Sequence, residues 1–157
     1  MRGIAYLLLK NEPAAEKEFN ALRAYLTPPR GEYMAGKVVD LARFLAAAYA
    51  GRSQEVTAGW QQLGGIFRRA VALEVGRAYL EVGALPEAEQ HLRFALKAVP
   101  DFLTYALTQF YLGKILEQTG KKAEALKAYQ EFLGHFENST AKLSQIAEAR
   151  AAVKRLM

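Results

Sequence analysis

The chain has 157 residues, with 21 Lys and Arg, 16 Asp and Glu, two His and no Cys, and its net charge is +5. This length suits one soluble globular domain, and the absence of Cys excludes disulfides, thiolate zinc sites and cysteine nucleophiles. Both signs of charge are interspersed, with no basic run longer than the pairs Arg68-Arg69 and Lys121-Lys122, so we expect no specific nucleic-acid partner.

Helix-forming residues dominate the chain, because Ala, Leu, Glu, Lys and Arg supply most of it. No window shows the alternation of polar and apolar residues that marks a strand. Helix-breaking residues recur at short intervals and separate helical segments of about 12–17 residues. These breakers are Asn11 to Pro13, Thr27 to Gly31, Gly51, Gly83 with Pro86, Pro100 with Asp101, Gly120, and Asn138 to Thr140. The sequence therefore predicts an all-α fold of antiparallel helical hairpins.

The first hairpin is predicted over residues 1–28. Its apolar run, Ile4 to Leu9, is shorter than the ~7–15-residue core of a secretory signal, and no stretch approaches the ~20 apolar residues that span a bilayer. We expect a soluble chain with no membrane partner; the cytoplasm is favoured, but no signal fixes the compartment. The segment fits a hairpin unit entered partway through its first helix, which indicates that the chain is a fragment of a longer one.

The second hairpin is predicted over residues 34–66, with Gly51 in the turn. One register places Asp40 and Arg43 in the core, which is unfavourable for charged side chains. A turn shorter by one residue places apolar residues there instead, and we prefer that register. Its core residues are Leu41, Phe44, Leu45, Ala48, Val56, Trp60 and Leu63.

The third and fourth hairpins, over residues 69–102 and 106–139, share one pattern. Counted from the first residue of each unit, Gly76 and Gly113 occupy position 8, and Gly83 and Gly120 occupy position 15. A small residue at position 8 lets two antiparallel helices approach closely. Glycine at position 15 permits the left-handed conformation that ends the first helix.

A last helix is predicted over about 140–156, with Ser139 or Thr140 as its N-cap. Its helical stripe consists of Leu143, Ile146, Ala147, Arg150 and Val153. A stack of hairpins must cover the apolar face of its last member, and we expect this helix to cap it.

The pattern of the hairpins resembles the tetratricopeptide repeat (TPR), a family with a 34-residue period. The residues that carry the resemblance are Leu112-Gly113, Gly76-x2-Tyr79, Ala125-x3-Tyr129 and Pro100. The resemblance implies a single TPR-like domain over residues 1–157, with hairpins stacked in a right-handed superhelix and a C-terminal capping helix. Both ends of the chain, Arg2 to Phe19 and Tyr129 to Leu156, are also similar to the C-terminal TPR regions of bacterial regulators that carry Ser/Thr kinase or winged-helix domains.

No motif in the sequence predicts catalysis, a cofactor or a metal. His91 and His135 fall in different hairpins, with no carboxylate at a suggestive spacing and no H-E-x-x-H pattern. We therefore interpret both as surface residues. Gly59 and Gly64 open a G-x4-G pattern, but the lysine that holds phosphates in such loops is missing. We therefore expect a protein that is not an enzyme.

The resemblance implies that the first helices of the hairpins line a concave groove. The predicted groove residues are Leu73, Arg77, Leu80, Leu107, Phe110, Lys114 and Glu117. Their apolar members would form the floor, and Arg77 and Lys114 would anchor an acidic group of a partner. In the alternative interpretation, the apolar members pack between helices, and Arg77 and Lys114 pair with Glu81 and Glu117 of their own helices.

These features predict a non-enzymatic protein–protein interaction module that binds a partner peptide or helix in its groove. The alternative is a self-association or assembly scaffold, or a structural tail of a larger bacterial regulator. The partner is expected to be a protein, and a homo-oligomer is a further expectation.

Overall fold

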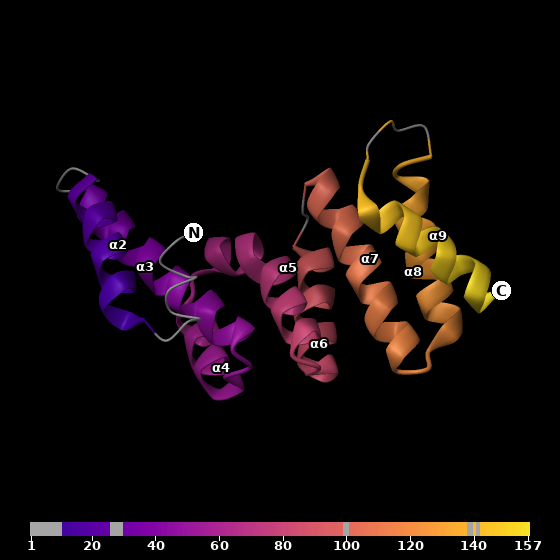
Figure 1. Cartoon of the computed structure of the whole chain (residues 1–157), viewed down its shortest axis with the longest axis horizontal. Helices are drawn as coiled ribbons and strands as arrows, with labels where there is room; N and C mark the ends of the chain where they lie inside the picture. Colours follow the sequence, from indigo (N-terminus) through magenta and orange to yellow (C-terminus); the bar gives the residue numbers. More distant parts are fainter. Residues whose placement is uncertain (1–10, 26–29, 99–100, 138–139, 141) are drawn as a thin grey trace. The chain divides into compact units, whose positions relative to one another are not determined.

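The computed structural model describes residues 11–25, 30–98, 101–137, 140 and 142–157. These residues form eight α-helices joined by short turns, with no strand among them (Figure 1). The all-α class predicted from the sequence is therefore confirmed.

The chain forms two compact units, which divide between residues 64 and 65. The N-terminal unit contains α2 (Glu12–Tyr25), α3 (Arg30–Tyr49) and α4 (Ser53–Gln62). The C-terminal unit contains α5 (Gly65–Glu81), α6 (Leu85–Lys97), α7 (Phe102–Gln118), α8 (Lys122–Gly134) and α9 (Ser144–Leu156). The sequence predicts one domain over residues 1–157, and the division falls just before the end of its second predicted hairpin, which was placed over residues 34–66.

Three turns between helices have the same backbone geometry. Gly51, Gly83 and Gly120 have φ angles of 70°, 79° and 77°, in the left-handed region that favours glycine. After α5, the amide of Gly83 donates to the carbonyl of Leu80, and the next amide donates to the carbonyl of Tyr79. These two hydrogen bonds satisfy carbonyls that the end of a helix leaves without partners. The glycine turns predicted from the sequence are confirmed.

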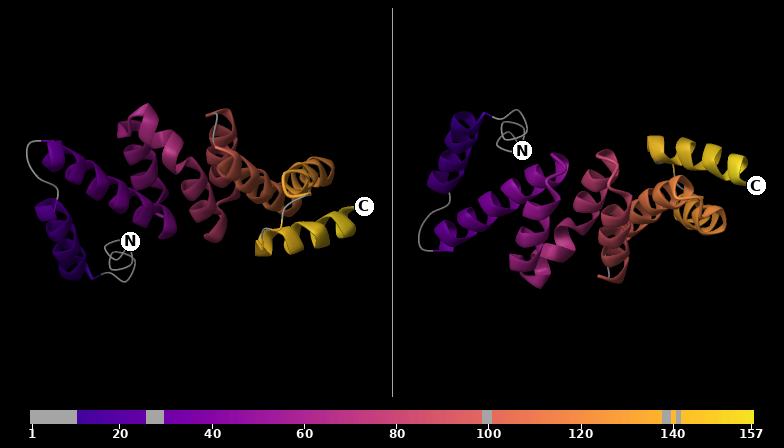
Figure 2. Two further views of the ribbon diagram at one scale, coloured as in Figure 1. Left: turned by 90° about the horizontal axis from the view of Figure 1, so that it is seen from above. Right: turned by 90° about the horizontal axis from the view of Figure 1, so that it is seen from below.

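Within the C-terminal unit, the helices follow one another in chain order from α5 to α9 (Figures 1 and 2). Helix α6 packs against both α5 and α7, and α8 packs against both α7 and α9. The two hairpins share a close approach: Leu92 of α6 lies over Gly76, and Tyr129 of α8 lies over Gly113. The predicted small residues at position 8 therefore have the expected role.

The core of the C-terminal unit is rich in aromatic side chains. The ring of Phe110 lies 5.2 Å from that of Phe132 and 6.0 Å from that of Tyr129, measured between centroids. Aromatic pairs at such separations add stabilisation beyond the area they bury. The largest fully buried side chains of this unit are Tyr79, Leu92, Phe110, Ile115, Leu116, Tyr129 and Phe132.

The N-terminal unit is held by contacts of α3 with α2 and α4. Phe44 of α3 stacks on Trp60 of α4, with ring centroids 6.2 Å apart, and Val56 is fully buried. Asp40 and Arg43 are exposed, and Phe44, Ala48 and Val56 are buried, as the preferred register of the second hairpin predicts. The other predicted core residues, Leu41, Leu45, Trp60 and Leu63, are only partly buried. Toward α2, the buried residues Ala15, Phe19, Val39 and Ala42 form one cluster.

The first helices of the hairpins begin four residues earlier than the predicted units do, at Arg30, Gly65 and Phe102. Helix α7 gains this turn because the carboxylate of Asp101 accepts hydrogen bonds from the amides of Leu103 and Thr104, at 3.1 and 3.0 Å. The hydroxyl of Thr104, which donates to the same carboxylate, and these amide bonds lower the pKa of Asp101. The first helix predicted within residues 1–28 and the predicted stop at Pro100 lie outside the described residues.

The prediction for the last helix is wrong in two respects. Helix α9 begins at Ser144, and its N-cap Leu143 makes no side-chain hydrogen bond, so neither predicted cap residue starts it. Of the predicted stripe, Ala147 and Arg150 are exposed. The residues that α9 buries are Ile146, which the predicted stripe included, and Ala149 and Ala152, which it did not. Burying an arginine without a partner is costly, so the face with two alanines packs inward.

Candidate interaction surface

The seven predicted groove residues lie on two helices that contact each other, α5 and α7. Leu73 and Phe110 belong to the interior, since their exposed fractions are 8% and 1%. The other five are partly exposed: Leu80, Leu107, Arg77, Lys114 and Glu117. The structure therefore brings the predicted residues onto neighbouring helices, but it places two of the apolar ones beneath the surface.

Phe110 is enclosed by the rings of Tyr111, Tyr129 and Phe132. It packs beneath the exposed residues and has almost no accessible surface that a partner could contact. A charged substitution at this position would disrupt the core of the unit, so a test of the surface must use other residues.

Apart from Phe102 at its first residue, α7 exposes apolar side chains in a row along one side of the helix. Leu103 is 47% exposed, and Leu107 and Tyr111 are half-buried. Their spacing of four residues places all three on one side of the helix. We call Leu103, Leu107 and Tyr111 the α7 stripe. Sequence reasoning missed Leu103 because the unit was predicted to begin at residue 106, and it assigned no role to Tyr111, although the four-residue spacing was visible.

Arg77 joins α5 to the α7 stripe. Its guanidinium carbon lies 5.0 Å from the centroid of the Tyr111 ring, a distance typical of a cation–π contact. Its Nη1 also donates to both carboxylate oxygens of Glu74, at 3.0 and 3.1 Å. The alternative interpretation expected a pair with Glu81; the pair is formed with the carboxylate one turn earlier in the helix.

Lys114 and Glu117 of α7 are bound by α9. The ammonium of Lys114 lies 2.7 Å from a carboxylate oxygen of Glu148, and Arg155 approaches Glu117 to 2.7 Å. Glu117 also accepts a hydrogen bond of 3.0 Å from the hydroxyl of Tyr129. Burial raises the pKa of Tyr129, and the neighbouring Glu117 raises it further. Lys114 thus pairs with another helix rather than with Glu117.

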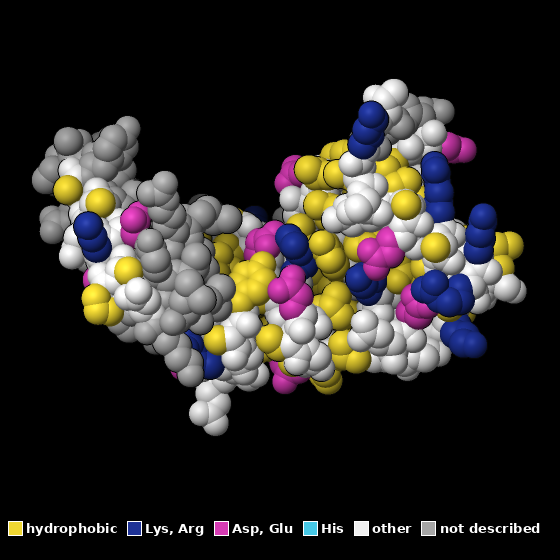
Figure 3. Space-filling view, in the orientation of Figure 1, with side chains coloured by type: hydrophobic (Ala, Val, Ile, Leu, Met, Phe, Trp, Pro, Cys, Tyr) yellow, Lys and Arg dark blue, Asp and Glu magenta, His cyan; other side chains and the backbone are white. Residues whose placement is uncertain are grey.

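These ion pairs leave the surface close to electrical neutrality. Arg77, Lys114 and Arg155 each have a carboxylate oxygen within hydrogen-bonding distance. Hydrophobic side chains lie over this part of the C-terminal unit among charges of both signs (Figure 3). Arg77 and Lys114, which were predicted to anchor an acidic group, are paired with carboxylates of the protein itself. A partner would therefore contact this surface mainly through apolar side chains.

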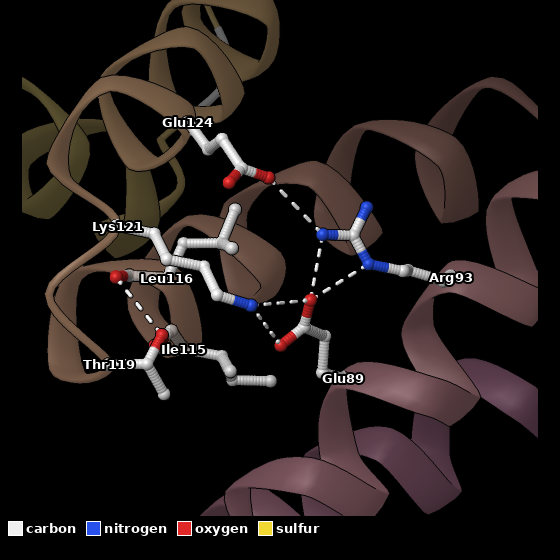
Figure 4. Close-up of polar contacts among 7 residues, drawn as sticks. All are labelled: Glu89, Arg93, Ile115, Leu116, Thr119, Lys121 and Glu124. Atoms are coloured by element: carbon white, nitrogen blue, oxygen red, sulfur yellow. Dashed lines mark hydrogen bonds and ion pairs between the residues drawn. The ribbon is translucent and has the colours of Figure 1, made fainter.

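A second cluster of charges links the two hairpins of the C-terminal unit (Figure 4). Glu89 of α6 accepts hydrogen bonds from Arg93, at 2.8 Å, and from Lys121 at the start of α8, at 3.1 and 3.2 Å. Arg93 also approaches Glu124 to 3.3 Å. Burial raises the pKa of Glu89, but the hydrogen bonds from Arg93 and Lys121 outweigh it, so the pKa is lowered. We interpret this cluster as a structural link.

The two histidines occupy aromatic surroundings. His91 is 8% exposed and stacks on Tyr79, with ring centroids 5.5 Å apart. Burial lowers the pKa of His91 to about 4, although Glu87 acts against this shift. His135 contacts the rings of Phe102 and Tyr105. The sequence interpretation placed both histidines on the surface, and for His91 this is wrong.

The described residues contain no group of three or more His, Cys, Asp or Glu that could hold a metal ion. None of the described helices is long and apolar enough to cross a membrane. Comparisons of the chain with protein-family models, with curated proteins and with solved structures found no match.

Proposed function

We propose that this chain is a non-enzymatic, TPR-like interaction module that binds a segment of another protein on the face formed by α5 and α7. The observation that carries the proposal is the identical construction of two successive hairpins. In each, a glycine of the first helix lies under a large side chain of the second, and a glycine seven residues later makes the turn. Stacked hairpins of this kind form rigid scaffolds on which a partner segment is ordered.

The proposed contact area consists of the α7 stripe with Leu80 and Arg77. Its exposed apolar area favours a partner segment that contributes hydrophobic side chains. The cations of this face already have carboxylate partners, so an acidic segment would gain little from them. We therefore expect binding that depends weakly on ionic strength.

The test is capture of partners from a lysate of the source organism by the wild-type chain and by two variants. The double variant Leu103→Glu/Leu107→Glu places two carboxylates on the α7 stripe. Lys127→Glu changes the net charge by the same amount on α8, where the Lys127 side chain is 78% exposed. Circular dichroism would verify that both variants keep their helices.

We expect one set of partners with the wild type and with Lys127→Glu, retained at 0.5 M NaCl because the contact is apolar. The double variant should lose these partners. Equal capture by all three chains would contradict the proposed surface, and partners that dissociate in salt would indicate an electrostatic contact elsewhere.

A second candidate function is self-association, as an assembly scaffold or the tail of a larger bacterial regulator. The observation that favours it is the exposure of two large apolar neighbours at the start of α7, since Phe102 is 58% and Leu103 is 47% exposed. A mass that rises with protein concentration, and that stays monomeric in Leu103→Glu/Leu107→Glu, would favour this function over binding of another protein.

A further inference from the structure

A cavity of about 290 Å³ lies between the end of α8 and the first half of α9. Its apolar wall consists of Leu133, Phe136 and Ile146, of which Phe136 and Ile146 are at most 9% exposed. Gly134 and two side chains of opposite charge, Glu137 and Arg150, complete the lining. The volume is close to the lower end of the range for small-molecule sites, so it fits one large apolar side chain or a ligand of similar size.

The charges at this cavity differ from the paired charges described above. Lys114, Glu117 and Glu89 are all held in ion pairs. Glu137 and Arg150 form no ion pair or hydrogen bond with any other described residue. Both are exposed, so each can contact a ligand without first breaking a contact of the protein.

The position of Arg150 in α9 explains why the cavity has a guanidinium at its edge. The same number of residues separates Gly76 from Gly113 and Gly113 from Arg150. The two glycines lie under Leu92 and Tyr129, side chains of the next helix that would collide with a Cβ. Arg150 therefore occupies the position that is a glycine in the two preceding hairpins. A following helix could not pack on Arg150 as closely as α6 packs on Gly76 or α8 on Gly113.

The buried residues of the three helices follow the same spacing. In α5, α7 and α9 the corresponding inward residues are Val75, Leu112 and Ala149, followed by Ala78, Ile115 and Ala152. The face of α9 with Ile146 and Arg150 thus corresponds to the face of α7 that packs on α8. In α7 that face is covered by Tyr129, whereas in α9 it borders the cavity.

We propose that this cavity binds a small zwitterion with an apolar body, the class to which free amino acids with large apolar side chains belong. The apolar wall would contact one side of the apolar body, Arg150 would bind the carboxylate, and Glu137 would bind the ammonium. A ligand that carries both charges can pair with both of these groups at once. A simple carboxylate would satisfy Arg150 but would be repelled by Glu137.

The first experiment is an NMR titration of the full chain with L-phenylalanine, followed through the methyl groups of Leu133 and Ile146. We expect saturable shifts with a dissociation constant of about 1 mM or tighter. Hydrocinnamate lacks the ammonium and phenethylamine lacks the carboxylate, and each should bind about ten-fold more weakly. Absence of saturable shifts would overturn the proposal.

Three variants test which charged side chain binds which charged group of the ligand. Arg150→Gln should weaken L-phenylalanine about ten-fold and strengthen phenethylamine, whose ammonium it no longer repels. Glu137→Gln should weaken L-phenylalanine and strengthen hydrocinnamate for the corresponding reason. Lys154→Gln is the matched control, because it removes another exposed cation of α9 outside the cavity lining. Equal affinities in Arg150→Gln and Lys154→Gln would show that the guanidinium does not bind the carboxylate. All three positions are exposed, so the variants keep the fold.

Discussion

The ring of Tyr129 lies directly over Gly113. A Cβ atom built on this glycine would come within 2.9 Å of two ring carbons, Cδ1 and Cε1. Gly76 has the same relation to Leu92, whose Cδ2 would lie 2.5 Å from such an atom. Each hairpin of the C-terminal unit therefore depends on a glycine for the distance between its two helices.

This contact predicts that Gly113→Ala destabilises the chain. The added methyl group must displace the Tyr129 ring, at a cost of about 1–3 kcal/mol that exceeds the gain in helix propensity. Urea unfolding followed by circular dichroism would measure the change. Gly134→Ala is the control, since a Cβ there meets nothing within 4 Å, and we expect it to be neutral or stabilising. Equal stability of the two variants would contradict a tight contact at Gly113.

The turn at Gly120 predicts a cost of a different origin. A Cβ there would have open space around it, but φ is +77°, which L residues other than Asn and Asp rarely adopt. Gly120→Ala should therefore lower the free energy of unfolding by about 1–2 kcal/mol, and Gly120→Asn by less. If both substitutions were silent, the left-handed conformation would not be a requirement of this turn.

The sequence was sufficient to predict features that depend on local chemistry. Glycines at 51, 83 and 120 identified the turns, and the shared positions of Gly76 and Gly113 identified the close approach of the helices. Both signals follow from the absence of a Cβ, a property that a residue has in any surroundings.

Features that depend on contacts between different helices could not be predicted from the sequence. The depth of Phe110 is set by three aromatic neighbours, two of which belong to another helix. The pair between Lys114 and Glu148 joins residues far apart in the sequence, and periodicity alone does not set the orientation of α9 about its axis. The predicted groove therefore mixed supporting residues with exposed ones.

Burial of His91 predicts a loss of stability in mild acid. The folded pKa of about 4 lies below the ordinary value of 6.5, so the unfolded chain binds this proton first. The contribution of His91 to stability is complete above pH 6.5 and declines as the pH falls toward 4, by up to about 3 kcal/mol. Urea unfolding at several pH values would measure the slope.

The variant His91→Phe separates this effect from the titration of carboxylates. It keeps an aromatic ring against Tyr79 but removes the titrating group. We expect a flatter dependence of stability on pH between 6.5 and 4. A slope identical to that of the wild type would show that His91 is accessible to protons in the folded chain.

The cluster around Glu89 predicts a contribution that depends on both acid and salt. The folded pKa of Glu89 is lowered, so its contribution is present above the unfolded value of about 4.5 and is lost as the pH falls through the folded value. At pH 7 and low salt, Glu89→Gln should cost about 1 kcal/mol, because two cations lose their shared carboxylate.

The matched control is Glu124→Gln, which removes a more exposed carboxylate with one contact to Arg93, at 3.3 Å. We expect it to cost less than Glu89→Gln at pH 7. The wild type and Glu89→Gln should converge below the folded pKa of Glu89, where the wild-type carboxyl is also neutral, and they should approach each other in 0.5 M NaCl because the cations are partly exposed. A difference that persists in acid would mean that Glu89 acts through packing rather than through its charge.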